Sequence, residues 1–383
     1  MAHKIPLFKI YWDEEDVDYV AKVIRNGSNW ANGNEIKQFE SELAELAGTK
    51  YCVTFNSGTS ALHALFLAYD IKQGCEVIVP SFTFIATANA ALFVGARPVF
   101  AEIEGKTYGL DPDDVNEKIT PYTKAIMPIH YGGCPCQIKE IKEIADDHEL
   151  FLFEDAAEAL GAKVGISSVG SFGDSSIFSF CQNKLITTGE GGCAVTNSKE
   201  IFEKLKLIRS HGRLENSDYF TSVESMDYLS LGHNFRMSTI TAALGISQIK
   251  KLNKIIKMRV KNAKYMNDEL GTLNDVAIPN SLRGSAHVYQ MYTIRINKPK
   301  QIRNKLMQYL ADAGIMCKIY FEPVHLTKFY RKELGYHEGD LPITENISGQ
   351  VLSLPMYPGL AEKELDYMIN TIKQFFGDEQ YEE

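Results

Sequence analysis

The stretch Glu76–Ile103, EVIVPSFTFIATANAALFVGARPVFAEI, decides the fold class. It contains an apolar, strand-like run at Glu76–Pro80, a helical run at Phe84–Val94 and a second strand-like run at Arg97–Ile103. Such alternation is typical of βαβ units, whose strands lie parallel in a sheet that helices cover on both faces. The pattern continues outward with the strands Lys124–Ile129 and Leu150–Phe153 and the helix Ile138–His148. The sequence therefore predicts an α/β fold built on a mostly parallel sheet.

The pattern changes after Gln248. The later residues predict a different mixture of elements, namely the helices Lys250–Leu270, Lys300–Ala313 and Glu362–Phe376 and the strands Val288–Ile296 and Met316–Phe321. A chain of 383 residues also exceeds the roughly 250–300 residues at which a single core stops growing. We predict a large domain over residues 1–248 and a smaller C-terminal α+β domain over residues 249–383.

Composition excludes several classes of function. The hydrophobic share of 45% and the charged share of 23% are ordinary for a globular protein. A formal net charge of −9 argues against a nucleic-acid partner. The odd number of cysteines, 7, does not suggest a disulfide framework, and the 9 histidines show no metal-ligand spacing, so we expect no metal. Neither a G-x-G-x-x-G nor a G-x-x-x-x-G-K-[ST] motif follows a predicted strand, which removes support for dinucleotide and P-loop sites.

The chain also lacks the signatures of membrane proteins. Its start, MAHKIPLFKIYWDEED, has no apolar run of the length found in signal peptides. No stretch approaches the roughly 20 apolar residues that span a bilayer. We expect a cytoplasmic protein without membrane association.

Two carboxylates follow the apolar run Leu150–Phe153. Glu154 and Asp155 are costly to bury unless a cation meets them. A protonated pyridine nitrogen is one such cation, and a carboxylate beside it keeps the ring electron-withdrawing. An acidic turn stabilised by a helix dipole explains the same residues equally well.

A single lysine stands in the loop that joins the predicted strands Ser176–Phe180 and Cys193–Thr196. The loop reads SFCQNKLITTGEGG, and Glu190 is the other charge in it besides Lys184. A lysine partly withdrawn from water has a lowered pKa, so its neutral amine can attack an aldehyde. Surface lysines are much commoner, but three glycines in four positions indicate backbone packed closely against something.

Two further segments end near predicted strands. The run Asn56-Ser-Gly-Thr-Ser-Ala-Leu62 precedes a helix whose first-turn amides suit a phosphate. Taken alone, it indicates an ordinary N-cap. Phe84 follows the strand Glu76–Pro80, where an aromatic ring can stack on a flat ligand, although a lone phenylalanine there is more often part of the core.

Together these features resemble the DegT/DnrJ-type sugar aminotransferases, which are fold-type I enzymes dependent on pyridoxal phosphate. The resemblance covers nearly the whole chain. It rests on the segments Trp30-Ala-Asn-Gly33…Phe39-Glu40, Pro80-Ser-Phe-Thr-Phe84-Ile-Ala-Thr-Ala-Asn89, Glu154-Asp155-Ala-Ala, Lys184-x-Ile-Thr-Thr-Gly-Glu-Gly-Gly192, Gly232-His-Asn234-Phe-Arg236-Met237 and Tyr320…Pro323-Val-His325-Leu. It implies a large domain with a mixed, mostly parallel sheet and a smaller C-terminal domain.

The resemblance assigns roles residue by residue. Lys184 would form a Schiff base with the cofactor, and Asp155 would pair with its pyridine nitrogen. The phosphate of the cofactor would be held by Ser57, Gly58, Thr59 and Ser179, and Phe84 would cover one face of its ring. Asn234 would reach the cofactor of the neighbouring subunit, in a homodimer with shared sites. Contacts to the sugar or nucleotide would come from His211, Arg236, Tyr320 and His325, and from the loop Ser210–Asp227 and the segment after Gly314.

One position departs from the common family pattern. Glu158 stands where many members carry Gln or His near the O3 atom of the cofactor, and an acidic residue there is similar to the perosamine-synthase branch. Members that remove a hydroxyl group carry His in place of the lysine, so Lys184 predicts amine transfer.

The implied reaction moves an amino group, with L-glutamate as donor, to a nucleotide-linked keto-sugar. A 4-keto-6-deoxyhexose, GDP-linked, is favoured, and amination at C3 stays open. The alternatives are another fold-type I activity, such as a dehydratase or lyase, and a catalytically idle regulator on the same fold.

Overall fold

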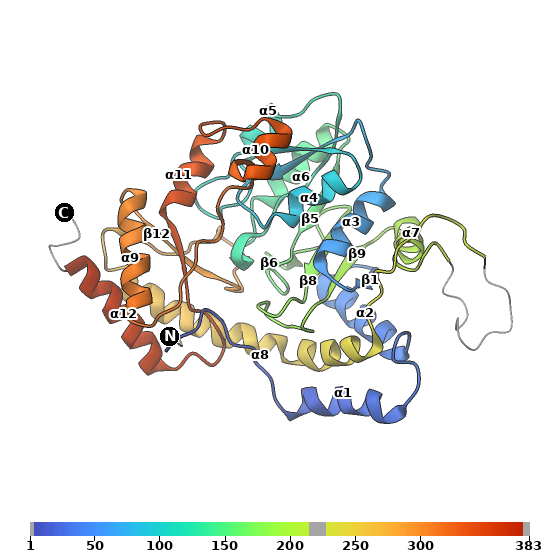
Figure 1. The fold of residues 1–383 in the computed structure, drawn as a ribbon, viewed down its shortest axis with the longest axis horizontal. Helices are drawn as coiled ribbons and strands as arrows, with labels where there is room; N and C mark the ends of the chain where they lie inside the picture. Colours follow the sequence, from blue (N-terminus) through green and yellow to red (C-terminus); the bar gives the residue numbers. More distant parts are fainter. Residues whose placement is uncertain (1–3, 214–226, 378–383) are drawn as a thin grey trace.

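The computed structural model describes residues 4–213 and 227–377. Its largest sheet has the strand order β1-β9-β8-β5-β4-β2-β3. Strands β1, β9, β8 and β5 of this sheet are labelled in Figure 1. β9 runs antiparallel to both its neighbours, so the remaining strands point the same way. The predicted mixed, mostly parallel sheet is confirmed. In spatial order the strands are Tyr51–Phe55, Gly192–Thr196, Ser175–Ser179, Phe151–Asp155, Thr123–Ile126, Glu76–Pro80 and Arg97–Ala101.

Helices cover both faces of this sheet because its strands alternate their apolar side chains. Val77 and Val79 on β2 pack into one buried cluster with α3, α4 and α7, whereas Ile78 packs into another with α5 and α6. A third cluster joins α2 and α8 to the β9 end of the sheet. These helices are α2 Asn34–Ala47, α3 Gly58–Ala68, α4 Ala86–Phe93, α5 Pro112–Glu117, α6 Ile138–Asp147, α7 Lys199–Arg209 and α8 Thr239–Leu270.

The C-terminal residues form a second layered unit with its own buried cluster. Its antiparallel sheet has the order β10-β12-β13, over Val276–Ala277, Tyr292–Ile296 and Val351–Leu354. The helices of this half of the chain are α9 Lys300–Asp312, α10 Lys328–Leu334, α11 Pro342–Gln350 and α12 Glu362–Gly377.

The remaining helix is α1 Glu14–Asn26. The short elements are a three-stranded ribbon, made of β11 Ser285–Ala286, β6 Lys163–Val164 and β7 Ser167–Ser168, and the 3₁₀ turns Tyr131–Gly133 and Val324–Leu326. Within the described ranges, no helix has the length and apolar character needed to cross a membrane.

α8 is longer than the sequence predicts. It begins at Thr239, where the Ser238 hydroxyl accepts a hydrogen bond from the Thr241 amide at 3.1 Å, and runs from the side of α2 to that of α12 (Figure 1). The predicted domain boundary at Gln248 therefore falls inside one continuous helix, and the division into two domains stays a prediction.

Two predicted strands differ from the structure. β12 begins at Tyr292 and not at Val288, because the amides of Val288 and Met291 donate to the carbonyls of Gly133 and Gly132 instead of to a strand. The segment 316–321 is not a regular strand. It meets β13 at the single bridge Lys318–Ser353 and then turns toward the large sheet. Of the predicted substrate loop 210–227, residues 214–226 lie outside the described residues.

Candidate active site

The C-terminal ends of β1, β2, β5 and β8 open into one cavity of about 550 Å³. Because these strands are parallel, the residues that follow them meet at the same edge of the sheet. The volume lies in the range of small-molecule sites. Most of the predicted site residues line it: Ser57, Gly58, Thr59, Phe84, Asp155, Glu158, Ser179, Lys184 and Tyr320.

The first turn of α3 forms one wall of the cavity. The Ser57 hydroxyl oxygen accepts a hydrogen bond from the Ser60 amide at 3.1 Å and so caps the helix. The amides of Gly58 and Thr59 belong to the first turn, which has no intrahelical acceptors. Ser179 lies beside them, since a β-carbon added to Gly58 would be 3.1 Å from that of Ser179. Amides and a hydroxyl gathered at a helix N-terminus fit a phosphate group.

The last glycine of the lysine loop, Gly192, is explained by this turn. A β-carbon on Gly192 would lie 2.5 Å from the amide nitrogen of Gly58 and 2.6 Å from its Cα. Both are backbone atoms, which cannot move aside cheaply. β9 therefore begins with glycine because the first turn of α3 packs directly against it, in agreement with the close backbone packing expected for this loop.

Asp155 ends β5 and is 3% exposed. Its Oδ2 accepts a hydrogen bond from the Thr87 hydroxyl at 2.7 Å and its Oδ1 one from the Ala157 amide at 3.1 Å. Burial raises the pKa of Asp155, although both hydrogen bonds and the charge of Lys184 oppose that shift. A positive charge in the cavity would favour its ionised form further, as a protonated ring nitrogen does.

Lys184 and Glu158 form an ion pair at the cavity. The Lys184 Nζ lies 3.3 Å from Glu158 Oε1, and their side chains are 14% and 6% exposed. Glu158 Oε2 accepts a hydrogen bond from the Gly132 amide at 2.8 Å, which fixes the carboxylate. The one lysine of the loop thus has its amine held over the carboxyl edge of the sheet.

Glu154 and Asp155 have opposite environments although they are neighbours. Glu154 Oε1 accepts hydrogen bonds from the amides of Phe172 and Gly173 at 2.8 and 2.9 Å. Its Oε2 accepts one from the Gly170 amide at 2.8 Å and lies 3.1 Å from His130 Nε2. Glu154 is fully buried and faces away from the cavity, so the acidic pair splits into a structural carboxylate and a cavity carboxylate.

Aromatic rings form the opposite wall. Phe84 is 60% exposed, so it is not part of the core, and its ring centroid lies 6.4 Å from that of Phe321. Tyr320 and Phe321 line the cavity because the segment after Lys318 leaves the small sheet. Rings placed in this way suit a flat ligand.

Thr87 and Lys318 are polar cavity residues to which the sequence assigned no role. Thr87 stands in an apolar helical run, and nothing in the local sequence indicates that its hydroxyl reaches Asp155. Lys318 lines the cavity and lies with its Nζ 4.9 Å from the ring centroid of Tyr320. A lone lysine in a predicted strand carried no signal for this position.

Four predicted residues lie outside the cavity lining, namely Asn234, His211, Arg236 and His325. Asn234 is exposed and pairs with Ser210 as an isolated bridge. The His211 amide donates to the His233 carbonyl at 2.9 Å, and Arg236 Nη1 donates to Ser210 Oγ at 3.3 Å. The roles assigned to Asn234, His211 and Arg236 stay predictions.

His325 has a structural environment, contrary to its predicted contact with the substrate. Its side chain is fully buried. Nδ1 lies 2.7 Å from Ser81 Oγ and Nε2 lies 3.1 Å from Glu345 Oε1, so both ring nitrogens have protein partners. No ring nitrogen is left for a substrate, because each of the two can take part in one hydrogen bond.

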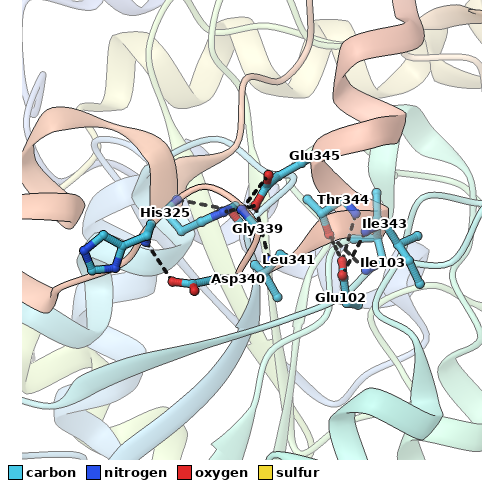
Figure 2. A network of polar contacts seen from close by, with 11 residues as sticks. Glu102, Ile103, His325, Gly339, Asp340, Leu341, Ile343, Thr344 and Glu345 are labelled. Atoms are coloured by element: carbon cyan, nitrogen blue, oxygen red, sulfur yellow. Dashed lines mark hydrogen bonds and ion pairs between the residues drawn. The ribbon is translucent and has the colours of Figure 1, made fainter.

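Figure 2 shows the network around His325. Glu345 accepts hydrogen bonds from the amides of Gly339 and Leu341 as well as facing His325. Beside it, Glu102 accepts from the amides of Ile343 and Thr344, at 2.9 and 2.8 Å, and from the Thr344 hydroxyl. Glu102 joins the C-terminal segment to the end of β3, and Glu345 joins different parts of the C-terminal segment to one another.

Comparisons with known proteins agree with the site. The model of the DegT/DnrJ/EryC1/StrS aminotransferase family matches residues 11–373. The chain is 35% identical to GDP-perosamine synthase of Vibrio cholerae, over 97% of this chain and 99% of that protein. It is 34% identical to UDP-N-acetyl-3-dehydro-alpha-D-glucosamine 3-aminotransferase of Acidithiobacillus ferrooxidans, over 97% and 95%.

Among solved structures, the chain is similar to PseC of Helicobacter pylori, an aminotransferase involved in the biosynthesis of pseudoaminic acid. The TM-score is 0.91 at 29% identity, over 97% of this chain and 99% of that one. The chain therefore belongs to the DegT/DnrJ/EryC1/StrS aminotransferase family and is a pyridoxal-phosphate-dependent sugar aminotransferase.

Proposed function

We propose that this enzyme transfers the amino group of L-glutamate to the keto group of a nucleotide-linked 4-keto-6-deoxyhexose, with Lys184 as the reacting amine. The observation that carries the proposal is the meeting of Lys184, Asp155 and the first turn of α3 at one cavity. These groups supply a reactive amine, a carboxylate for a ring nitrogen and a phosphate-binding turn.

The residues present fit pyridoxal phosphate. The amides of Gly58 and Thr59 and the hydroxyl of Ser179 would hold the phosphate, and Asp155 would hold the ring nitrogen. The environment of Asp155 supports this fit. Burial raises the pKa of its carboxyl group, and a cationic ring nitrogen beside it would oppose that shift. When bound, the cofactor supplies a reactive carbonyl carbon and an electron-withdrawing ring.

Each remaining group has a task that its position allows. The Lys184 Nζ takes the proton from the carbon that carries the amino group of the donor. In the second half of the reaction, it gives a proton to the carbon that receives the amino group. Glu158 keeps that nitrogen in place through the 3.3 Å contact. Lys318 puts a cation at the cavity for an anionic substrate, which a nucleotide-linked sugar is.

Two observations support a GDP-linked hexose. Glu158 is similar to the acidic residue of the perosamine-synthase branch, and one relative carries the name GDP-perosamine synthase. The relative named for a UDP-linked 3-keto sugar makes that substrate the second candidate.

We also propose a homodimer with shared sites. Asn234 is exposed and outside the cavity of its own chain, a position that allows it to serve a neighbouring subunit.

A half-reaction tests the central proposal. Protein loaded with pyridoxal phosphate should absorb visible light, lose that band when L-glutamate is added and release 2-oxoglutarate in equal amount. Loss of water or ammonia without amine transfer would indicate a lyase, and no reaction with any amino acid would indicate a regulator. The loaded, aminated protein should then aminate GDP-4-keto-6-deoxymannose faster than the UDP-linked 3-keto sugar; the reverse preference would select the second candidate.

A further inference from the structure

We propose that Thr87 is a positioning residue that aims the carboxylate of Asp155 into the cavity, and that Thr83 holds Thr87 in the orientation this requires. The inference rests on the proposed function, in which Asp155 pairs with the ring nitrogen of the cofactor. It gives a role to two hydroxyl groups that otherwise have none in the site.

The hydroxyl hydrogens can be assigned by counting. Thr87 Oγ1 lies 2.7 Å from Asp155 Oδ2, 2.8 Å from Thr83 Oγ1 and 3.1 Å from the Phe84 carbonyl oxygen. Thr87 has one hydrogen to donate, and a bond to an ionised carboxylate is the strongest of these. Thr83 must then donate its own hydrogen to Thr87, so the two hydroxyls point in sequence toward Asp155.

The second oxygen of Asp155 is held independently. Oδ1 accepts the Ala157 amide at 3.1 Å, while Oδ2 accepts Thr87 from α4. The carboxylate is therefore fixed at both ends by groups from two different segments. Each oxygen keeps a lone pair that is available to a ligand. Thr83 and Thr87 are each 1% exposed, so water does not compete easily for these bonds.

Electrostatics agree with the geometry. Burial raises the pKa of Asp155, and the Thr87 hydrogen bond lowers it. Without that bond the carboxylate would take up a proton at a higher pH, and a protonated carboxyl group holds a cationic ring nitrogen poorly.

The segment that carries Thr83 is anchored from the C-terminal side. The Ser81 carbonyl accepts the Val324 amide at 2.9 Å, and the Ser81 hydroxyl oxygen accepts the His325 amide at 3.1 Å. His325 Nδ1, 2.7 Å from the same hydroxyl, then accepts its hydrogen, and Nε2 faces Glu345 in the network of Figure 2. The residues after β2 thus have a fixed start two positions before Thr83.

The test compares Thr87→Val, which keeps the shape but removes the hydroxyl, with Thr87→Ser, which keeps the hydroxyl. Cofactor affinity of the unloaded protein is measured by titration across pH, together with its thermal midpoint. Thr87→Val should bind pyridoxal phosphate about 10- to 100-fold more weakly at pH 7, because a buried hydrogen bond to a charged group is lost. The pH below which affinity falls should move up, and Thr87→Ser should restore both values.

The control is Thr344→Val, which removes a buried hydroxyl from Glu102, and neither of these residues lines the cavity. It should lower the thermal midpoint and leave the pH profile of cofactor binding unchanged. Equal affinity and an equal pH profile in Thr87→Val and the unsubstituted protein would overturn the inference, whereas an unsubstituted protein that binds no cofactor would overturn the proposed function. If Thr87→Val does not fold, Thr83→Val decides: a smaller shift of the profile in the same direction supports the inference, and no shift contradicts it.

Discussion

Glu154 and Asp155 are adjacent in sequence and buried to nearly the same degree, but the protein satisfies them differently. Glu154 has three backbone amides and His130 around its two oxygens. Asp155 has one amide and one hydroxyl. Strand geometry produces the split, because successive side chains of β5 point to opposite faces of the sheet. A carboxylate that the protein saturates with donors is structural, and one that keeps free lone pairs toward a cavity is prepared for a ligand.

The distinction extends to the other carboxylates of the molecule. Glu102, Glu154 and Glu345 each have at least three hydrogen-bond partners within the protein, and we call them the saturated carboxylates. We call Asp155 and Glu158 the cavity carboxylates. The predictions below test whether the two groups behave differently.

The largest effect is expected at Lys184, which forms an ion pair with the cavity carboxylate Glu158. Lys184→Arg keeps a positive charge near Glu158 but removes the primary amine. The half-reaction with L-glutamate should slow by at least about a thousandfold, because the reacting nitrogen is lost. Borohydride reduction followed by mass spectrometry should find no cofactor attached to the variant. Attachment at another lysine with normal turnover would contradict the assignment.

The next effect separates Asp155 from its neighbour. Asp155→Asn should weaken cofactor binding roughly 100- to 1000-fold, since a buried ionic partner is removed. The unloaded variant should nevertheless be as stable at pH 7 as the unsubstituted protein, or more stable. The raised pKa of Asp155 means that the native state holds its proton more tightly than the unfolded chain, so this group takes stability away as pH rises through that range. The difference in stability should vanish in acid, below the unfolded pKa of Asp.

Glu154→Gln is the matched comparison. Whichever oxygen of Glu154 the NH₂ group replaced, it would face at least one backbone N–H donor, so at least one buried amide would lose its acceptor. The free energy of unfolding should fall by about 1–3 kcal/mol, while cofactor affinity of the folded protein stays within about threefold. If Glu154→Gln and Asp155→Asn changed stability and affinity alike, the distinction between saturated and cavity carboxylates would fail.

The sequence indicated which residues would lie near the cavity, but it gave no indication of the roles of Glu102 and Glu345, for a physical reason. Asp155 ends β5, and Gly58 and Lys184 lie in the segments that follow β1 and β8, so local pattern and the rule of parallel strands bring them together. His325 misled the prediction because its partner Ser81 is 244 residues away, and nothing near His325 shows that its ring is already bonded. Thr87 was missed for a related reason. The hydroxyl of Thr87 on α4 gains a role only through its hydrogen bond to Asp155, which lies on β5. The segment 316–321 has the apolar pattern of a strand, but only Lys318 pairs with β13.

A smaller effect is expected at Asn234, if this residue of one subunit donates a hydrogen bond into the cavity of the other. Asn234→Ala should lower cofactor affinity about tenfold, because one hydrogen bond to a charged phosphate would be lost. Mixed dimers of Asn234→Ala with Lys184→Arg give the control. If the sites are shared, each mixed dimer has one site that combines Lys184 of one chain with Asn234 of the other, and about half of the sites should bind the cofactor as tightly as the unsubstituted protein does. If each site is built from a single chain, no site of the mixed dimer has both residues. Unchanged affinity in Asn234→Ala would show that Asn234 does not reach the cofactor of the neighbour.

The smallest effect on activity is expected in the saturated group. Glu102 caps the start of α11 by accepting the amides of Ile343 and Thr344, and it is 7% exposed. Glu102→Gln should therefore lower the free energy of unfolding by about 1–3 kcal/mol, measured by denaturant titration. Turnover per folded molecule should stay within about twofold, since no atom of Glu102 lines the cavity. A large loss of turnover without loss of stability would mean that the network of Figure 2 acts on the reaction itself, and the boundary between the two groups of carboxylates would have to be redrawn.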